Sequence, residues 1–303
     1  LHGAFEKLSD RDFNERVLII GNMPSDMDAS GTRVSAFTEP LAAAQVHSYI
    51  LPVAADLGLE SKSSELISLL NRRFSAFVAM GGDDTDRTLF GQSNRLSFNT
   101  NSRRDRFEAS LLLEKLTTIK RQPNLNHRLF AVCRGAQFVA SLMGNGIGLD
   151  IPTDLPSSTV KHGIARGEGP SYVENGSEPT HTIQLLYPGK ILKSMLSGQS
   201  RFLGNTYHHQ HILPSARAWM PLTTVAISPD DGVVEAAEYG DSILLVQFHP
   251  ELMRTRSTGD IKLVGELIMR GAAQFMTPNR EQRCEEKLRG SGRASPAANI
   301  SGF

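Results

Sequence analysis

Short apolar runs alternate with polar, helix-patterned stretches through the first half of the chain. The runs end at turn residues and cover residues 16–22, 46–53, 74–82 and 128–133. Between them, segments such as SSELISLLNRRF and RRDRFEASLLLEKLTTIKR carry apolar residues at helical spacing. Buried parallel strands that alternate with helices produce this pattern. The first half therefore predicts a doubly wound α/β sheet with helices on both faces, which is a three-layer α/β/α fold.

The apolar runs of the second half follow one another at shorter intervals. They cover residues 181–191, 222–228, 233–241 and 243–251. Closely spaced strands of this kind predict antiparallel hairpins attached to the mostly parallel central sheet. A helix is then predicted from about Gly259 to Met276, where apolar residues recur at helical spacing.

The two ends of the chain and one internal stretch lack these patterns, and the two ends set the expected domain boundaries. Residues 1–15 form an N-terminal extension, and residues 16–277 form one α/β domain. Residues 278–303 are rich in Gly, Ser, Ala and Arg, which predicts a polar, disordered tail. Residues 150–180 form a long polar stretch with many Gly and Pro, and a loop of that length is expected to act as a lid or specificity loop.

Composition narrows the class of protein. Hydrophobic residues make up 40% of the chain, and Lys+Arg and Asp+Glu both total 32. Without a block of like charges, neither nucleic acid nor a membrane surface is expected as the main partner. No apolar run approaches the roughly 20 residues that a membrane span needs. The chain has 2 cysteines, which gives no disulfide framework and indicates a reducing, cytoplasmic compartment.

One of these cysteines lies where a strand is expected to meet a helix, in the stretch Ala131-Val132-Cys133-Arg134-Gly135. The small residues two positions before and after Cys133 are typical of a nucleophile elbow, whose tight turn brings those positions together. A helix N-terminus favours the thiolate, and the N–H of Arg134 can point at a developing oxyanion. The alternative is a buried hydrophobic role, which free cysteine often has.

Two further strand ends carry chemically useful residues. His249 ends an apolar strand before Pro250, and Glu251 follows at i+2, where an extended chain would place both side chains on one side. Such a carboxylate can orient the imidazole as the third member of a Cys–His–acid triad. The alternative is a capped strand end with a solvated Glu251. Gly81 and Gly82 end another strand, where they provide unobstructed N–H donors or form an ordinary glycine-rich turn.

Other polar clusters have simpler interpretations. The aspartates that follow Gly82 either contact an amine of the substrate or cap the next segment; they are Asp83, Asp84 and Asp86. The basic residues of the segment 103–106 lie beside Asp105 and Glu108, which predicts a solvated, salt-bridged helix face. The segment YHHQHI contains His208, His209 and His211. With no acid or cysteine at ligand spacing nearby, one pocket-lining histidine is preferred over a metal site.

Taken together, these motifs resemble the class I glutamine amidotransferase superfamily, which has a flavodoxin-like fold. Within it, the chain is most similar to the γ-glutamyl hydrolase branch (peptidase family C26), especially γ-glutamyl-γ-aminobutyrate hydrolases. The matching stretches run in the family's order from about Val17 to Met276 and are GGDDTDRTLFG, RRDRFEASLL, AVCRGAQ, GNTYHHQ, SPDDGVVEAAEY and LLVQFHPE. The chain departs from the family at Arg87, where Pro is usual, and at Phe90, where Tyr is usual. These departures affect the expected specificity for the leaving group and do not touch the triad.

The resemblance implies hydrolysis of a γ-glutamyl amide through a cysteine γ-glutamyl thioester. It assigns Cys133 as nucleophile, His249 as general base and then acid, and Glu251 as the orienting carboxylate. It places the N–H groups of Gly82 and Arg134 in the oxyanion hole. The substrate-binding positions that it implies are Gly81, Gln137, His208 and Gln210.

The resemblance implies no metal and no organic cofactor. The expected partner is a small γ-glutamyl substrate, and a homodimer is the candidate assembly. Two alternatives to the hydrolase stay open: a glutaminase subunit that supplies ammonia to a partner synthase, and a catalytically silent regulatory homologue. The glutaminase subunit would need an acceptor domain or partner. The intact Cys133–His249–Glu251 set argues against the silent homologue.

Overall fold

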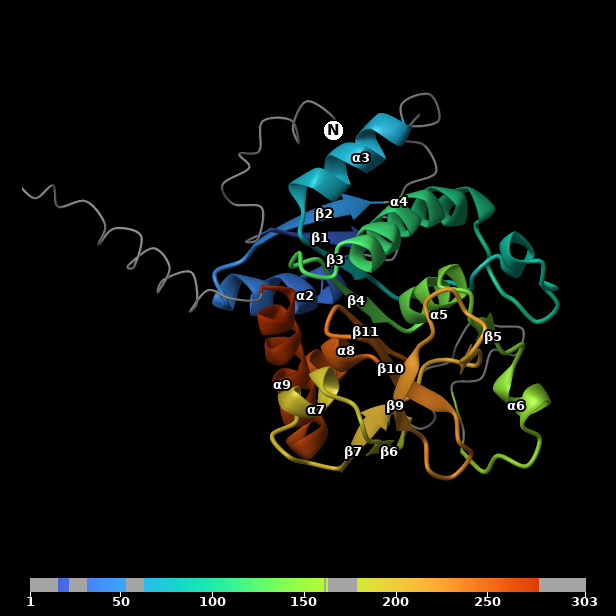
Figure 1. Ribbon diagram of the computed structural model, residues 1–303. Coiled ribbons are helices and arrows are strands. Elements are labelled where there is room, and N and C mark those ends of the chain that lie inside the picture. The colour runs from blue at the N-terminus through green and yellow to red at the C-terminus, as the bar shows by residue number, and fades with distance from the viewer. Residues whose placement is uncertain (1–15, 22–31, 53–62, 161, 163–178, 278–303) are drawn as a thin grey trace, which may run out of the picture.

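The computed structural model describes residues 16–21, 32–52, 63–160, 162 and 179–277. These residues form a nine-stranded sheet with the order β2-β1-β3-β4-β11-β10-β9-β6-β7 (Figure 1). Its strands, in chain order, are β1 (Arg16–Gly21), β2 (His47–Pro52), β3 (Ala76–Ala79), β4 (Arg128–Val132), β6 (Thr180–Leu185), β7 (Arg201–Asn205), β9 (Thr223–Ile227), β10 (Val234–Tyr239) and β11 (Ile243–Val246). A separate two-stranded pair joins β5 (Gly146–Ile147) to β8 (Ile212–Leu213).

The strand directions confirm the predicted sheet, which is parallel in its first part and continues into antiparallel hairpins. From β2 to β11 the neighbouring strands are parallel, and from β11 to β7 they are antiparallel. The hairpins continue the sheet directly, and β11 lies in its middle, between β4 and β10. All four residues of β11 are buried, which suits a central strand that is covered on both faces.

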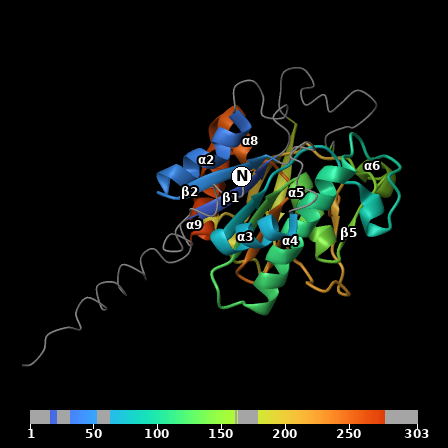
Figure 2. The ribbon, with the colours of Figure 1, turned by 90° about the horizontal axis from the view of Figure 1, so that it is seen from above.

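Helices cover both faces of the sheet (Figure 2), as predicted. One face carries α2 (Thr32–Ala43), α7 (Ile191–Met195), α8 (Pro250–Arg256) and α9 (Gly259–Met276). The other carries α3 (Ser63–Arg73), α4 (Ser102–Arg121) and α5 (Arg134–Leu142). The short α6 (Ile151–Asp154) and the 3-10 helix η3 (Arg87–Phe90) lie in connecting segments. The helix predicted at Gly259–Met276 is confirmed.

The two cores follow from the alternation of side chains along each strand. Val17 and Ile19 of β1 pack in the core beneath α2, α8 and α9. Leu18 and Ile20 of the same strand pack in the core beneath α3, α4 and α5. All four are almost fully buried, and each such side chain contributes about 1.5–3 kcal/mol to folding. A strand with consecutive apolar residues from Val17 to Ile20 is thereby held in the middle layer.

Three adjacent parallel strands bring the candidate residues together. In the sheet, β3 pairs with β4 so that Ala79 faces Ala131, and β4 pairs with β11 so that Val132 faces Val246. The residues that follow these strands therefore leave the sheet at the same edge, where α/β sheets gather their ligands. The expected N-terminal extension, the expected tail and most of the 150–180 loop lie outside the described residues. Within the described part of the chain, no helix has both the length and the apolar character for crossing a bilayer.

Candidate active site

Cys133 occupies a tight turn between β4 and α5. Its backbone has φ 51° and ψ −117°, an uncommon and strained conformation for a residue with a side chain. Its N–H donates to the carbonyl of Val246 at 2.8 Å, which ties the turn to β11. A Cβ on Gly135 would lie 2.3 Å from the carbonyl oxygen of Ala79, so only glycine fits two residues after the cysteine. The geometry is that of a nucleophile elbow.

His249 lies three residues after β11 ends at Val246 and forms the N-cap of α8, and Glu251 lies in the first turn of that helix. The Nδ1 of His249 is 2.6 Å from Oε1 of Glu251, and both side chains are buried. The expectation that an extended chain places them on one side is wrong, because the helix begins at Pro250 and its first turn brings Glu251 back to the imidazole. The pairing itself is present.

The surroundings of His249 strongly favour its protonated, positively charged form. Burial by itself lowers the pKa of His249, but attraction to Glu251 and to Cys133, together with side-chain hydrogen bonds to both, raises that pKa to about 10. Because Nδ1 faces Glu251, the imidazole presents Nε2 for exchange of a proton with the thiol. The protonated imidazole of His249 therefore lies between the side chains of Glu251 and Cys133.

Asn205 holds the backbone of His249 from both sides. Its Oδ1 accepts a hydrogen bond from the N–H of His249 at 2.8 Å, and its Nδ2 donates to the carbonyl of His249 at 3.1 Å. Asn205 is fully buried at the end of β7, and this positioning residue is missing from the sequence analysis. The available signal was its place as the first residue of the NTYHHQ motif.

Gly81 and Gly82 follow β3, and Gly81 lies against the side chains of His249 and Cys133. A Cβ on Gly81 would lie 2.8 Å from Cε1 of His249 and 3.4 Å from the Cβ of Cys133. Gly82 has φ 151°, a conformation that side chains rarely adopt. Arg134 is the first residue of α5, so its N–H has no acceptor inside that helix. The structure thus brings both expected oxyanion donors to the edge of the sheet where Cys133 lies.

The side chain of Arg134 is buried in an ion-pair network with α4. It contacts both Asp105 and Glu108, and Glu108 also accepts from Nε of Arg104 at 2.8 Å. The expected solvated face is wrong for these residues: Glu108 is only 2% exposed, whereas Arg106 is exposed. Helical spacing carried back from the apolar Leu111 and Leu112 places Glu108 on the inner face. The network fixes the elbow helix to α4.

The loop aspartates bind the protein itself. Asp86 is the N-cap of η3 and accepts from the N–H of Thr88 at 3.1 Å and from Nδ2 of Asn94 at 2.8 Å. Burial raises the pKa of Asp86, but hydrogen bonds from Ser102, Thr88 and Asn94 outweigh it and lower that pKa to about 2. The capping interpretation therefore holds for Asp86. Asp84 accepts from the N–H of Phe98 at 2.7 Å.

The side chains of Gln137 and His208 meet at the backbone carbonyl of Gln210 in one buried network. Nε2 of Gln137 donates to the carbonyl of Gln210 at 3.0 Å and to Oε1 of Gln247 at 3.2 Å. The carbonyl of Gln210 also accepts from Nδ1 of His208 at 3.0 Å. This network links the elbow helix to the segment that carries Asn205.

The histidines of YHHQHI have acidic neighbours after all. His209 lies 2.9 Å from Asp84, His211 lies 3.2 Å from Asp154, and His208 lies 3.6 Å from a carboxylate of β10. No acid stands at ligand spacing near these histidines in the sequence, and the acids that contact them come from distant segments. Spacing along the chain could not reveal them.

Fold and site together define a glutamine amidotransferase-like α/β protein with a cysteine at a strained elbow. The glutamine amidotransferase from Thermotoga maritima has the same fold, with a TM-score of 0.53 at 13% identity over 88% of this chain and 99% of that one. The glutamine amidotransferase from Methylobacillus flagellatus also has a TM-score of 0.53, at 14% identity over 88% and 96%. The glutaminase domain of CTPS from Trypanosoma brucei, solved with bound acivicin, has a TM-score of 0.52 at 15% identity over 87% and 95%.

The chain belongs to the peptidase C26 family, whose model matches residues 23–251. Protein NtpR from Enterococcus hirae is 30% identical over 214 residues, which cover 69% of this chain and 79% of NtpR. The glutamine amidotransferase-like protein YvdE from Lactococcus lactis is 31% identical over 176 residues, which cover 57% of this chain and 64% of YvdE. Family and fold support an amide hydrolase of the glutamine amidotransferase type.

Proposed function

We propose that this chain hydrolyses γ-glutamyl amides through a thioester on Cys133. The observation that carries the proposal is the strained Cys133 at the start of α5, beside the His249–Glu251 pair. Membership of the peptidase C26 family supports the same substrate class. A reducing, cytoplasmic setting would keep the thiol available for this chemistry.

In the first half-reaction, the Cys133 sulfur attacks the γ-carbonyl carbon and forms the C–S bond. The carbonyl oxygen becomes an oxyanion, which the N–H groups of Gly82 and Arg134 would stabilise. The imidazolium of His249 then gives its proton to the leaving nitrogen as the C–N bond breaks. A free amine leaves, and the γ-glutamyl group remains on sulfur as a thioester.

In the second half-reaction, water replaces the amine. His249, now neutral, takes a proton from water, and the hydroxyl attacks the thioester carbon. The C–S bond breaks, glutamate is released, and the thiolate and imidazolium are restored. Glu251 orients the imidazole through both steps and stabilises its positive charge.

The proposal is tested by covalent labelling with a glutamine-analogue diazo ketone, followed by peptide mapping. We expect one label on Cys133 in the wild type and none in Cys133→Ala. Cys284→Ser removes the other cysteine of the chain and should leave labelling unchanged. Folded wild-type protein without a label on Cys133 would falsify the mechanism.

Turnover separates the candidate substrates and tests the roles of the two partners. The assay compares γ-glutamyl-aminobutyrate, γ-glutamyl peptides, polyglutamate and free glutamine. Preference for free glutamine would point to the ammonia-supplying alternative. We expect His249→Ala to lose more of kcat than Glu251→Gln, because the orienting residue contributes less than the base. Equal turnover of His249→Ala and wild type would remove His249 from the mechanism.

A further inference from the structure

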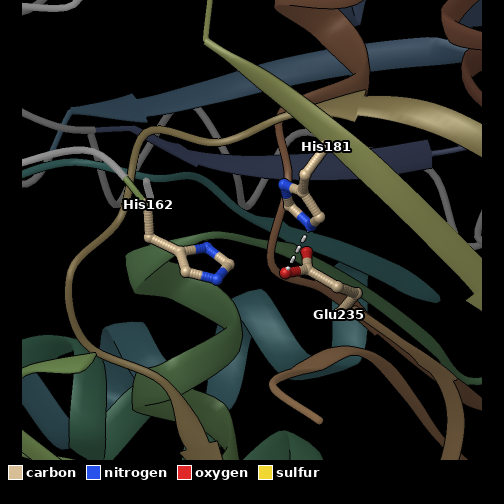
Figure 3. A group of neighbouring side chains, drawn as sticks. All are labelled: His162, His181 and Glu235. Atoms are coloured by element: carbon tan, nitrogen blue, oxygen red, sulfur yellow. Dashed lines mark hydrogen bonds and ion pairs between the residues drawn. The ribbon is translucent and has the colours of Figure 1, made fainter. Parts of the chain in front are cut away.

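Three buried side chains from separate segments converge at one point (Figure 3): His162, His181 on β6 and Glu235 on β10. One candidate ligand atom of each lies within 4.8 Å of the other two. Nε2 of His181 is 3.0 Å from Oε1 of Glu235. The ring of His208 lies close by, with its centroid 4.9 Å from that of His162.

Several polar atoms at this point have no hydrogen-bond partner among the described residues. They are Oε2 of Glu235, Nδ1 of His181 and Nε2 of His208. Glu235 is 0% exposed, and its described ion-pair partners are the two histidines rather than a lysine or arginine. Buried polar groups in folded proteins are normally satisfied, so these atoms are candidates to bind a ligand.

The hydrogen bonds of His208 specify the kind of partner. Its Nδ1 lies 3.0 Å from the carbonyl of Gln210, and a carbonyl can only accept, so Nδ1 carries the proton. In the neutral ring, Nε2 then holds a lone pair, and this atom lies 3.6 Å from Oε1 of Glu235. These two atoms can lie against each other in a buried site if Nε2 also carries a proton or if a metal cation binds both of them.

The surroundings of His162 suit an imidazole that binds a metal. Nδ1 lies 2.9 Å from the hydroxyl of Thr206, and Nε2 lies 2.9 Å from Oδ2 of Asp231. A cation on either ring nitrogen would replace one of these two contacts, and the other nitrogen would keep its hydrogen-bond partner. Partners of this kind orient metal-bound histidines.

We propose that His162, His181 and Glu235 bind one divalent transition-metal ion of the Zn²⁺ type, with His208 as the fourth ligand. Imidazole nitrogen with a single carboxylate is a donor set typical of zinc, whereas magnesium and calcium prefer oxygen donors. Four protein ligands in a buried position form a closed, structural site. This site departs from the expectation of no metal that the family resemblance implies, and it does not depend on the proposed reaction.

The metal would stabilise the segment that supports the active site. His208 lies between Asn205, which holds the backbone of His249, and Gln210, which binds Gln137 of the elbow helix. An ion bound to His208 would fix this segment to β6 and β10. Binding to the folded state alone also raises stability, so removal of the ion should lower the thermal midpoint.

The test measures metal content and spectra in a Cys133→Ala background, which removes the thiolate as a competing ligand. The protein is expressed with zinc or cobalt, dialysed against a chelating resin and analysed by mass spectrometry for metal per chain. We expect one ion per chain. We also expect His181→Asn and Glu235→Gln to bind it about 100-fold more weakly, which is the upper end of the cost of losing a residue that orients a ligand. The matched control is His211→Asn, because His211 is also buried but pairs with Asp154.

Absorption and X-ray absorption spectra of the cobalt form give an independent readout if a variant fails to fold. We expect a first shell of nitrogen and oxygen in tetrahedral geometry. The proposal is overturned if folded protein holds no metal after expression with either ion. It is also overturned if His181→Asn retains the full content or if the shell contains sulfur. A proton on His208 in place of the metal is the alternative that the first of these outcomes would support.

Discussion

Replacing Gly81 with alanine tests whether the active site depends on close packing over the catalytic pair. The added Cβ would lie 2.8 Å from Cε1 of His249, and ordinary contacts begin at 3.4 Å. The imidazole would therefore have to move by at least about 0.6 Å, or the loop by the same amount. Gly81 is not among the glycines with positive φ, so the effect is steric rather than conformational.

The expected cost follows from the size of this displacement. A misplacement of about 1 Å can reduce a rate by about 100-fold. A shift of about 0.6 Å should therefore slow the labelling of Cys133 by the diazo ketone about 10- to 100-fold. The thermal midpoint should change little, because the movable neighbour is a side chain at the edge of the sheet.

The assay is the second-order rate of Cys133 labelling, followed by mass spectrometry and compared with thermal unfolding. Gly21→Ala is the matched control, since its Cβ would meet Met80 at 3.8 Å and Ile50 at 3.9 Å, which are ordinary contacts. We expect Gly21→Ala to label at the wild-type rate. A wild-type rate in Gly81→Ala would show that the contact with His249 does not constrain the site.

Three further predictions concern the supports of the site. Because the pKa of His249 is raised to about 10, the stability that its charged form contributes is complete below about pH 6.5 and is lost as the pH rises to about 10. Urea unfolding across this range should show a smaller loss of unfolding free energy in Glu251→Gln than in the wild type. Equal pH slopes in the two proteins would contradict the coupling of His249 to Glu251. Glu108→Gln breaks a buried ion pair and should lower the free energy of unfolding by about 3–5 kcal/mol, against at most about 0.5 for the exposed Arg106→Ala. Asn205→Ala removes two hydrogen bonds to the backbone of His249 and should cost about 1–3 kcal/mol in unfolding experiments, with slower Cys133 labelling; an unchanged labelling rate would exclude a positioning role.

Local chemistry explains why much of the site is visible in the sequence. The elbow around Cys133 needs small neighbours and a strand-to-helix change, and both are properties of adjacent residues. His249 and Glu251 are only two positions apart, so their pairing was predicted, although the reason was a helical turn rather than an extended chain. The alternation of apolar runs and helical stretches was enough to predict the layers of the fold.

The sequence by itself determined the class of fold, the strand ends that carry chemistry and the residues able to perform it. The tertiary structure alone decided which distant groups meet: Arg134 with Glu108, Asn205 with His249, and His162 with Glu235. Such contacts depend on the order of strands in the sheet and on the packing of helices against it. Spacing along the chain carries no record of that order, because side chains far apart in sequence become neighbours only when the layers close.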